Sequence, residues 1–269
     1  MCPTEFAHKE VDELLREVIS RRALMVLAST PLEEGDYIAH GLWGQELAAR
    51  ISDPEREEEL FLMDVRSRES YEAGRIAGAH HFELSDWASP ENLERLPHHH
   101  KIIVICDTGL AAAQVVAGLR LLGFDAAVPK TGINGWAQTD MTAKLVEEFQ
   151  AARYPVKRVP PAKNGQAPAP TDAVFHAPED HEFAMIAARV HEVFSDLPAA
   201  GGNGHAGHII TASELNALLQ DELTREAWFP LDLRRVGDFV AVAHTAGAAR
   251  TGVAVGVVPG PWGLVREVR

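Results

Sequence analysis

The segment IIVICDTGLAAA at 102–113 constrains the fold of this chain more than any other stretch. It opens with a short apolar, mostly β-branched run, which is typical of a strand buried within a parallel sheet. A loop of small residues follows, and 111–124 then carries apolar residues at helical spacing up to Gly123, a common helix stop. The pattern predicts a strand, a short loop and a helix, the repeating unit of α/β folds.

Cys106 lies in the loop of this unit, at the carboxyl end of the strand, where open α/β sheets place their binding sites. Backbone N–H groups of the loop and the positive end of the following helix both stabilise a thiolate or a bound anion. This placement favours a reactive thiol. An inert, buried cysteine at the end of a strand is the alternative, and the loop by itself leaves both readings open.

Composition excludes several classes of protein. The chain has 269 residues, which suggests about two domains. Lys and Arg number 25 against 39 Asp and Glu, a net charge of −14, which argues against nucleic acid and anionic membranes as partners. Two cysteines, Cys2 and Cys106, are too few for a disulfide framework or a four-cysteine zinc site. With no signal-peptide pattern and no span of ~20 apolar residues, we expect a cytoplasmic protein.

Three motifs occur in order: DVRSRESYEAGRIAGA at 64–79, IIVICDTGLAAA at 102–113 and KTGINGW at 130–136. Together they resemble the rhodanese family, over a stretch from about Gly35 to Trp136. The resemblance implies an α/β fold with a central parallel sheet flanked by helices. It also implies that Cys106 is a catalytic nucleophile.

In the chemistry that this resemblance implies, the Cys106 thiolate attacks the sulfane sulfur of a donor such as thiosulfate. The resulting persulfide passes its sulfur to cyanide or to a thiol, and no metal or other cofactor takes part. The loop amides would hold the donor and the persulfide, in the manner of an oxyanion hole. The residues that this assigns to substrate binding are Asp107, Thr108, Gly109, Leu110, Ala111 and Ala112.

The loop departs from the family pattern at two positions. Many active members carry an arginine where this chain has Ala111, and Asp107 adds a negative charge next to the nucleophile. A neighbouring carboxylate is expected to raise the thiol pKa and to repel thiosulfate. The alternative function is therefore a weak or inactive module that binds another protein. An arsenate reductase or phosphatase site is disfavoured, because the arginine that would clamp an oxyanion after Cys106 is absent.

Asp64 and Arg66 are expected to be structural: Asp64 caps the following turn and Arg66 forms an ion pair. The same Asp-x-Arg pattern recurs at Asp232 and Arg234, in a region without a nucleophile, which favours this role. The resemblance places two further motif residues. Arg75 stands where the family has histidine, and Trp136 closes the third motif.

The recurrence belongs to an internal duplication. Sliding the chain against itself aligns Asp64-Val65-Arg66 with Asp232-Leu233-Arg234, and one further residue of offset aligns Gly78-Ala79 with Gly247-Ala248. The second copy stops before it repeats the cysteine segment. We therefore expect a tandem arrangement with a second, partial rhodanese-like α/β module.

The expected organisation has four parts. They are an N-terminal helical segment (1–31), a rhodanese-like domain (32–154), a proline-rich linker (155–171) and the incomplete module (172–269). Because half a sheet exposes an edge, 172–269 is expected to pack against the first domain, a protein partner or a second copy in a homodimer.

Apolar positions at helical spacing predict a helix over 8–19 that lies against the first domain, and another over 183–197. Histidines cluster at 98–100, at 80–81 and at His205 and His208. Consecutive histidines point in different directions on an extended chain, so we expect solvated loops and no metal site.

Overall fold

The computed structural model describes residues 3–28, 41–53, 59–137, 156–157, 177–197, 217, 220, 231–232, 244–245 and 249–250. The chain divides into two compact units. The first consists of Met1–Ala152 with Asp172–Ala212, and the second of Arg153–Thr171 with Ser213–Arg269. Cys106 belongs to the first unit, which therefore holds the candidate site.

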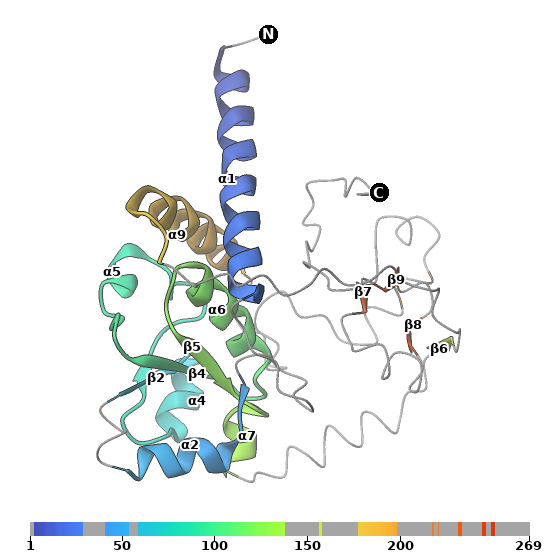
Figure 1. Cartoon of the computed structure of the whole chain (residues 1–269). Helices are drawn as coiled ribbons and strands as arrows, with labels where there is room; N and C mark the ends of the chain where they lie inside the picture. Colours follow the sequence, from blue (N-terminus) through green and yellow to red (C-terminus); the bar gives the residue numbers. More distant parts are fainter. Residues whose placement is uncertain are drawn as a thin grey trace. The chain divides into compact units, whose positions relative to one another are not determined.

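The first unit is built on a five-stranded sheet in the order β1-β5-β4-β2-β3, and its strand pairs are parallel (Figure 1). This confirms the predicted α/β fold with a central parallel sheet. Because the strands run in one direction, their carboxyl ends meet at one edge, and Cys106 follows β4 at that edge. The strands are β1 (Gly41–Leu42), β2 (Leu60–Asp64), β3 (His80–His81), β4 (Lys101–Ile105) and β5 (Ala126–Pro129).

Strand β4 is the central strand of the sheet. Its four residues from Ile102 to Ile105 are 0% exposed, which accounts for the unbroken apolar run in the sequence. Successive side chains point to opposite faces. Ile102, Val104 and Cys106 join one hydrophobic cluster, whereas Ile103 and Ile105 join the other. The side chain of Cys106 therefore lies on the face covered by α6.

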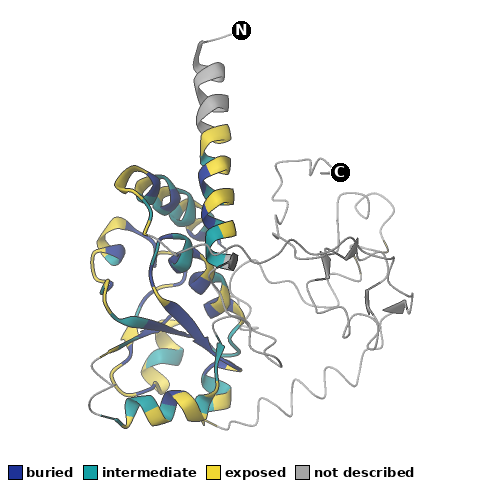
Figure 2. Cartoon of the chain, viewed as in Figure 1, coloured by how far each residue is buried: buried dark blue, intermediate teal, exposed yellow. Residues whose placement is uncertain are grey.

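Helices cover both faces of the sheet, and buried residues concentrate in the strands between them (Figure 2). Residues of α1, α5, α6 and α9 share one cluster with Cys106. Residues of α2, α4 and α7 share the cluster on the opposite face. The helices are α1 (Pro3–Ala28), α2 (Gly44–Ile51), α4 (Arg68–Ala73), α5 (Pro90–Leu93), α6 (Leu110–Leu121), α7 (Gly132–Ala137) and α9 (Asp180–Ser195).

Helix α1 is longer than the predicted helix over 8–19, and only part of its apolar face is covered. Val18 is buried and Ile19 packs against the core, as expected, whereas Leu14 is 51% exposed. The helix crosses α6, where the buried Arg22 donates from Nε to the carbonyl oxygen of Leu121 at 3.1 Å.

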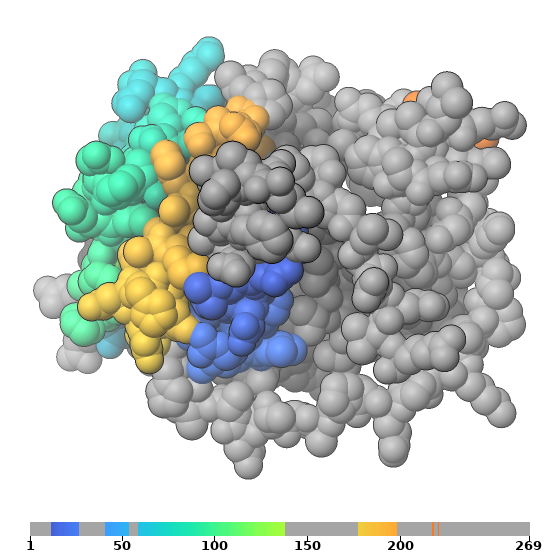
Figure 3. All heavy atoms as spheres, turned by 90° about the horizontal axis from the view of Figure 1, so that it is seen from above, coloured from blue at the N-terminus to red at the C-terminus, as the bar shows by residue number. Residues whose placement is uncertain are grey.

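Helix α9 belongs to the first unit, whereas the sequence predicts that this stretch is part of the module at 172–269. It lies beside α1 (Figure 3). Glu182 of α9 forms an ion pair with Arg21 of α1. Phe194 packs edge-on against Trp87 with ring centroids 5.3 Å apart. These contacts hold α9 against the face of the sheet on which the Cys106 side chain lies. The other expected domain boundaries stay predictions.

The described residues of the second unit include two short strand pairs. β6 (Val156–Lys157) pairs antiparallel with β8 (His244–Thr245), and β7 (Leu231–Asp232) pairs parallel with β9 (Ala249–Arg250). Several expectations lie outside the described residues, among them Cys2, His205, His208, Arg234 and most of the linker. No helix in the described ranges is both long enough and apolar enough to cross a membrane.

Candidate active site

The loop between β4 and α6 wraps around the sulfur of Cys106. Gly109 caps α6 with φ at 93°, in the left-handed region that glycine adopts readily. Its N–H donates to Sγ of Cys106 at 3.1 Å, and the N–H of Ala112 donates to the same atom at 3.3 Å. The sulfur thus sits at the amino end of a 12-residue helix, among backbone donors. Such donors stabilise a sulfur anion.

Burial works against the charged form of the same thiol. Cys106 is only 4% exposed, and this burial raises its pKa above that of a free cysteine. The backbone N–H groups of Ala112, Thr108, Gly109 and Ala111 lower the pKa, but by less in total than burial raises it. The resting group at neutral pH is therefore the thiol, and a thiolate formed there finds donors already in place.

The structure brings the sequence-predicted loop residues together around Sγ. Thr108 and Gly109 are half-buried, and Ala111 and Ala112 are buried against the core. Leu110 differs from them, because it is 54% exposed. In the first turn of α6, a backbone N–H group therefore donates to the sulfur, and all the side chains are apolar.

The sequence predicts that Asp107 raises the pKa of the Cys106 thiol, whereas in the structure its charge interacts with Arg66 and Asp64. Its pKa is raised by burial, lowered by the charge of Arg66 and raised by that of Asp64. Asp107 is not among the leading causes of the shift at Cys106, which are burial and backbone hydrogen bonds. The carboxylate of Asp107 therefore couples electrostatically to the Asp64–Arg66 pair.

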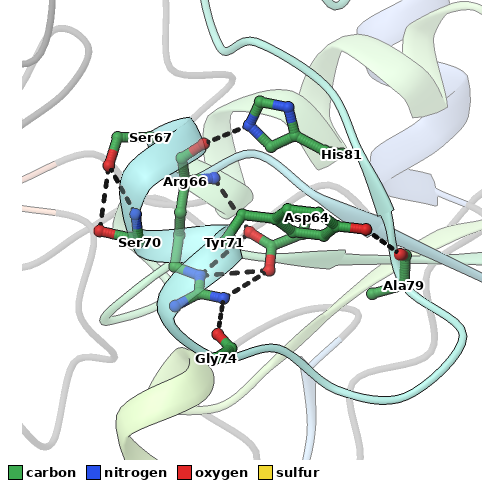
Figure 4. Close-up of polar contacts among 8 residues, drawn as sticks. All are labelled: Asp64, Arg66, Ser67, Ser70, Tyr71, Gly74, Ala79 and His81. Carbon is green, nitrogen blue, oxygen red and sulfur yellow. Dashed lines mark hydrogen bonds and ion pairs between the residues drawn. The ribbon is translucent and has the colours of Figure 1, made fainter.

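Asp64 and Arg66 form the expected ion pair at the carboxyl end of β2, next to β4 (Figure 4). Arg66 donates from Nη2 to Oδ2 of Asp64 at 2.7 Å, from Nε to Oδ1 at 3.0 Å, and from its backbone N–H to Oδ1 at 3.0 Å. A further bond runs from Nη2 to the carbonyl oxygen of Gly74 at 2.7 Å. The side chain of Asp64 is 0% exposed and that of Arg66 is 6% exposed, so the pair stabilises a buried turn.

Neighbouring residues secure the segment that follows this turn (Figure 4). The hydroxyl of Tyr71 donates to the carbonyl oxygen of Ala79 at 2.7 Å. His81 Nε2 lies 2.8 Å from the carbonyl oxygen of Arg66, which only accepts, so Nε2 carries the hydrogen. Arg75 is exposed, with its guanidinium 4.7 Å from the ring centroid of Tyr71. Arg75 thus contacts the motif that holds Arg66.

The first residues of α7 hold the backbone of Cys106 in place, a role that the sequence pattern does not predict. Ile133 donates its N–H to the carbonyl oxygen of Cys106 at 2.9 Å, and Asn134 donates to that of Asp107 at 3.2 Å. Gly132, with φ at 58°, packs directly on both carbonyl groups. Trp136 is half-buried and packs in the cluster on the opposite face of the sheet. In the sequence, the glycine of the Thr-Gly pair in KTGINGW is the residue that could have indicated this close contact between two backbone segments.

Within the described ranges, no group of three or more His, Cys, Asp and Glu side chains is arranged to hold a metal ion. Two histidines of the clusters at 98–100 and 80–81 contact aromatic rings. His98 stacks on Phe124 with centroids 5.0 Å apart, and His80 stacks on Phe61 at 4.8 Å.

The buried thiol leads to a pH prediction. In a Cys2→Ala protein, where Cys106 is the remaining cysteine, alkylation by iodoacetamide is expected to rise about tenfold per pH unit between about pH 6 and 8. The thiolate is the reactive form, and burial places the pKa above the ordinary value, so the rate should not level off in this range. Alkylation rates measured against pH test this. A plateau below about pH 7 would mean that the loop donors outweigh burial.

Part of this chain is similar to known proteins. Residues 44–139 match the family model described as a rhodanese-like domain. The putative sulfurtransferase YtwF of Bacillus subtilis (strain 168) is 33% identical over 82 residues, which cover 30% of this chain and 78% of that protein.

Solved structures with similar folds include a rhodanese-related protein from Thermoplasma volcanium, at 23% identity and a TM-score of 0.33. That match covers 37% of this chain and 91% of the other. A rhodanese-like domain protein from Staphylococcus aureus shows 26% identity and a TM-score of 0.31, over 36% of this chain and 89% of the other. On the strength of the family model and the sequence relative, the chain belongs to the rhodanese-like family.

Proposed function

We propose that the protein is a sulfurtransferase that moves sulfane sulfur from a donor such as thiosulfate to a thiol or cyanide, through a persulfide on Cys106. The observation that carries this proposal is the cradle of Gly109 and Ala112 N–H groups around Sγ. Such a cradle stabilises negative charge on a sulfur atom where water is largely excluded. A cysteine with only a packing role has no need of it.

In the proposed reaction the Cys106 thiolate attacks the outer sulfur of thiosulfate. The S–S bond of the donor breaks, sulfite leaves with the bonding electrons, and a persulfide anion remains on Cys106. Cyanide then attacks the outer sulfur of that persulfide, which yields thiocyanate and restores the thiolate. Charge and atoms balance in both steps, and the residues of the loop supply only binding and charge stabilisation.

Steady-state transfer tests the proposal with a matched control. Thiocyanate production from sulfane donors and cyanide is expected to fall to background in Cys106→Ala, because the nucleophile is gone. Cys2→Ala removes the other cysteine of the sequence and should keep full activity. Transfer that survives in Cys106→Ala, or its absence from the wild type with both thiosulfate and an aryl thiosulfonate, would contradict the proposal.

A protein-binding module without turnover is the second candidate. Ala111 in place of a loop arginine favours it, since the loop then lacks a cation of its own for an anionic donor. The expected result for this candidate is a partner that the wild type and Cys106→Ala capture equally well. Partner binding that needs the intact thiol would exclude it.

We also propose that the second unit is the partial repeat expected from the sequence. In the first unit, β2 and β3 pair with Met63 opposite His80 and Asp64 opposite His81. In the second, β7 and β9 pair in parallel with Leu231 opposite Ala249 and Asp232 opposite Arg250. These are the positions that the duplication equates, which supports a tandem arrangement. In this arrangement, residues 213–269 of the second unit would serve a protein partner or homodimer, in a cytoplasmic protein.

A further inference from the structure

Two helices of the first unit, α1 and α9, lie outside residues 44–139, the stretch that matches the family model. Both lie on the face of the sheet that α6 covers, and their apolar side chains share one cluster with Cys106 (Figure 1). An ion pair between Arg21 and Glu182 joins the two helices. The chain thus has an additional pair of helices against α6, the helix whose first turn donates to Sγ.

The closest contact with α9 is at Gly118, in the middle of α6. A Cβ at this position would lie 2.9 Å from Cζ2 and 3.0 Å from Cη2 of Trp87, and 3.3 Å from Cγ1 of Val190 in α9. Trp87 is 0% exposed, and Phe194 of α9 packs edge-on against its ring. Helix α9 therefore contacts α6 both directly, through Val190, and indirectly, through Trp87.

The carboxyl end of α6 is held by α1 and by the segment that leads into α9. A Cβ at Gly123 would lie 2.8 Å from Cδ of Pro178, just before α9. Arg22 of α1 is buried and donates from Nε to the carbonyl oxygen of Leu121 at 3.1 Å. These contacts hold α6 at its middle and at its carboxyl end, whereas its amino end carries the donors to Sγ.

The position of α6 decides whether those donors reach the sulfur. Its 12 residues form one continuous α-helix, in which successive backbone hydrogen bonds keep the rise per residue fixed. A displacement at Gly118 is therefore transmitted to Ala112, whose N–H donates to Sγ at 3.3 Å. A hydrogen bond to the thiolate favours the charged form, and without it burial, which favours the neutral thiol, is less opposed.

Taking the proposed function as given, we infer that α9 positions α6 for sulfur transfer. Val190 and Phe194 are the positioning residues, and they act through Gly118 and Trp87 on the N–H group that holds the sulfur. The docking of α9 is thus part of what makes Cys106 reactive. Residues 44–139 alone do not contain every residue on which the reaction depends.

Gly118→Ala in the full-length Cys2→Ala protein tests this link, with iodoacetamide alkylation of Cys106 as the measurement. Alanine is a better helix former than glycine, so α6 stays formed while the added methyl group pushes it away from Trp87. Alkylation at about pH 7.5 is expected to slow about three- to tenfold, because the thiolate loses part of a hydrogen bond to a charged atom. The curve of rate against pH should move to higher pH with the same upper limit, since the pKa changes and access does not.

Trp87→Phe provides the rescue. A phenyl ring does not reach the positions of Cζ2 and Cη2, the two atoms closest to the methyl group added at Gly118. The indole Nε1 has no hydrogen-bond partner among the described residues, so the exchange breaks no hydrogen bond. The double variant Gly118→Ala/Trp87→Phe is therefore expected to react within about twofold of the Cys2→Ala parent. A rate as slow as that of Gly118→Ala alone would overturn the inference, because the contact with Trp87 would not be what positions α6.

Phe194→Ala tests the part played by α9 itself. It removes the ring that packs against Trp87 and should also slow alkylation. Val190→Ala is a smaller deletion at the same contact, and it replaces Phe194→Ala if that variant does not fold. Ala188→Gln, at an exposed position of α9, is the matched control and should react at the parent rate. Leu62→Ala, in the cluster on the opposite face of the sheet, controls for stability lost without a change at α6.

Two further results would overturn the inference. One is a rate in Phe194→Ala that is unchanged or faster, and the other is equal slowing in Leu62→Ala, which would indicate general loosening. Sulfur loading by thiosulfate and by benzenethiosulfonate, followed by intact mass, should fall together with the alkylation rate in the same variants. A parent protein that takes up no sulfur would contradict the proposed function, while the alkylation rates would still decide whether α9 positions the Cys106 site.

Discussion

Replacing Gly132 by alanine is expected to destabilise the first unit by about 2–5 kcal/mol, through backbone strain and the loss of two hydrogen bonds. The φ of Gly132 is 58°, where alanine is strained. A Cβ there would also overlap the carbonyl oxygen of Cys106 and lie 2.7 Å from the carbonyl carbon of Asp107. The loop would have to withdraw, and the N–H bonds of Ile133 and Asn134 to those carbonyl oxygens would break.

Gly74→Ala is the matched control for this substitution. Its φ is 172°, which is ordinary extended backbone, and no atom lies within 4 Å of the added Cβ. We expect a change within about 0.5 kcal/mol, as for surface substitutions in general. Urea unfolding gives the free energy of unfolding of both variants. The alkylation rate of Cys106 reports on the contact with α7, because the thiol becomes more exposed when Gly132 moves away from Cys106. Equal stability and equal alkylation in the two variants would contradict the packing of Gly132.

Asp64→Asn is expected to lower the free energy of unfolding by about 3–5 kcal/mol, because it removes the carboxylate to which the buried Arg66 guanidinium donates. Arg66 and Asp64 have side chains only 6% and 0% exposed, so water cannot replace the lost charge. The turn after β2 and the electrostatic contact of Arg66 with Asp107 both depend on this pair. We therefore expect slower sulfur loading as well as lower stability.

Glu83→Gln makes the same chemical change in an exposed ion pair. Glu83 lies 3.8 Å from Arg68, and the two side chains are 50% and 63% exposed. Exposed pairs contribute about 1 kcal/mol or less, so this variant should unfold close to the wild type. Urea unfolding midpoints compare the two. If Asp64→Asn lowered the unfolding midpoint no more than Glu83→Gln, the Asp64–Arg66 pair would not be needed for stability.

The sequence predicted the elements that depend on local pattern. The apolar run before Cys106 indicated a strand buried on both faces, and β4 has its residues from Ile102 to Ile105 completely buried. The small residues after it indicated a loop at the start of a helix, which the structure places at Leu110. Arg66 forms an ion pair, as predicted, and the structure shows that its partner is Asp64, two residues earlier at the end of the strand.

Features that depend on distant contacts could not be predicted in this way. The spacing of apolar residues identified the α9 helix, but not that Glu182 meets Arg21 and Phe194 meets Trp87 in the first unit. The charge of Asp107 was evident, whereas its coupling to Arg66 depends on β2 lying next to β4. The contact of Gly132 with the Cys106 carbonyl likewise requires β5 and α7 to return to the same edge.

The intact mass of the donor-treated protein shows whether Cys106 carries sulfur. After incubation with an aryl thiosulfonate and removal of excess donor, the protein should gain the mass of one sulfur atom, located on the peptide that contains Cys106. Cyanide should remove this mass, Cys2→Ala should still acquire it, and Cys106→Ala should not. A protein that gains no sulfur, or gains it equally in Cys106→Ala, would contradict the claim.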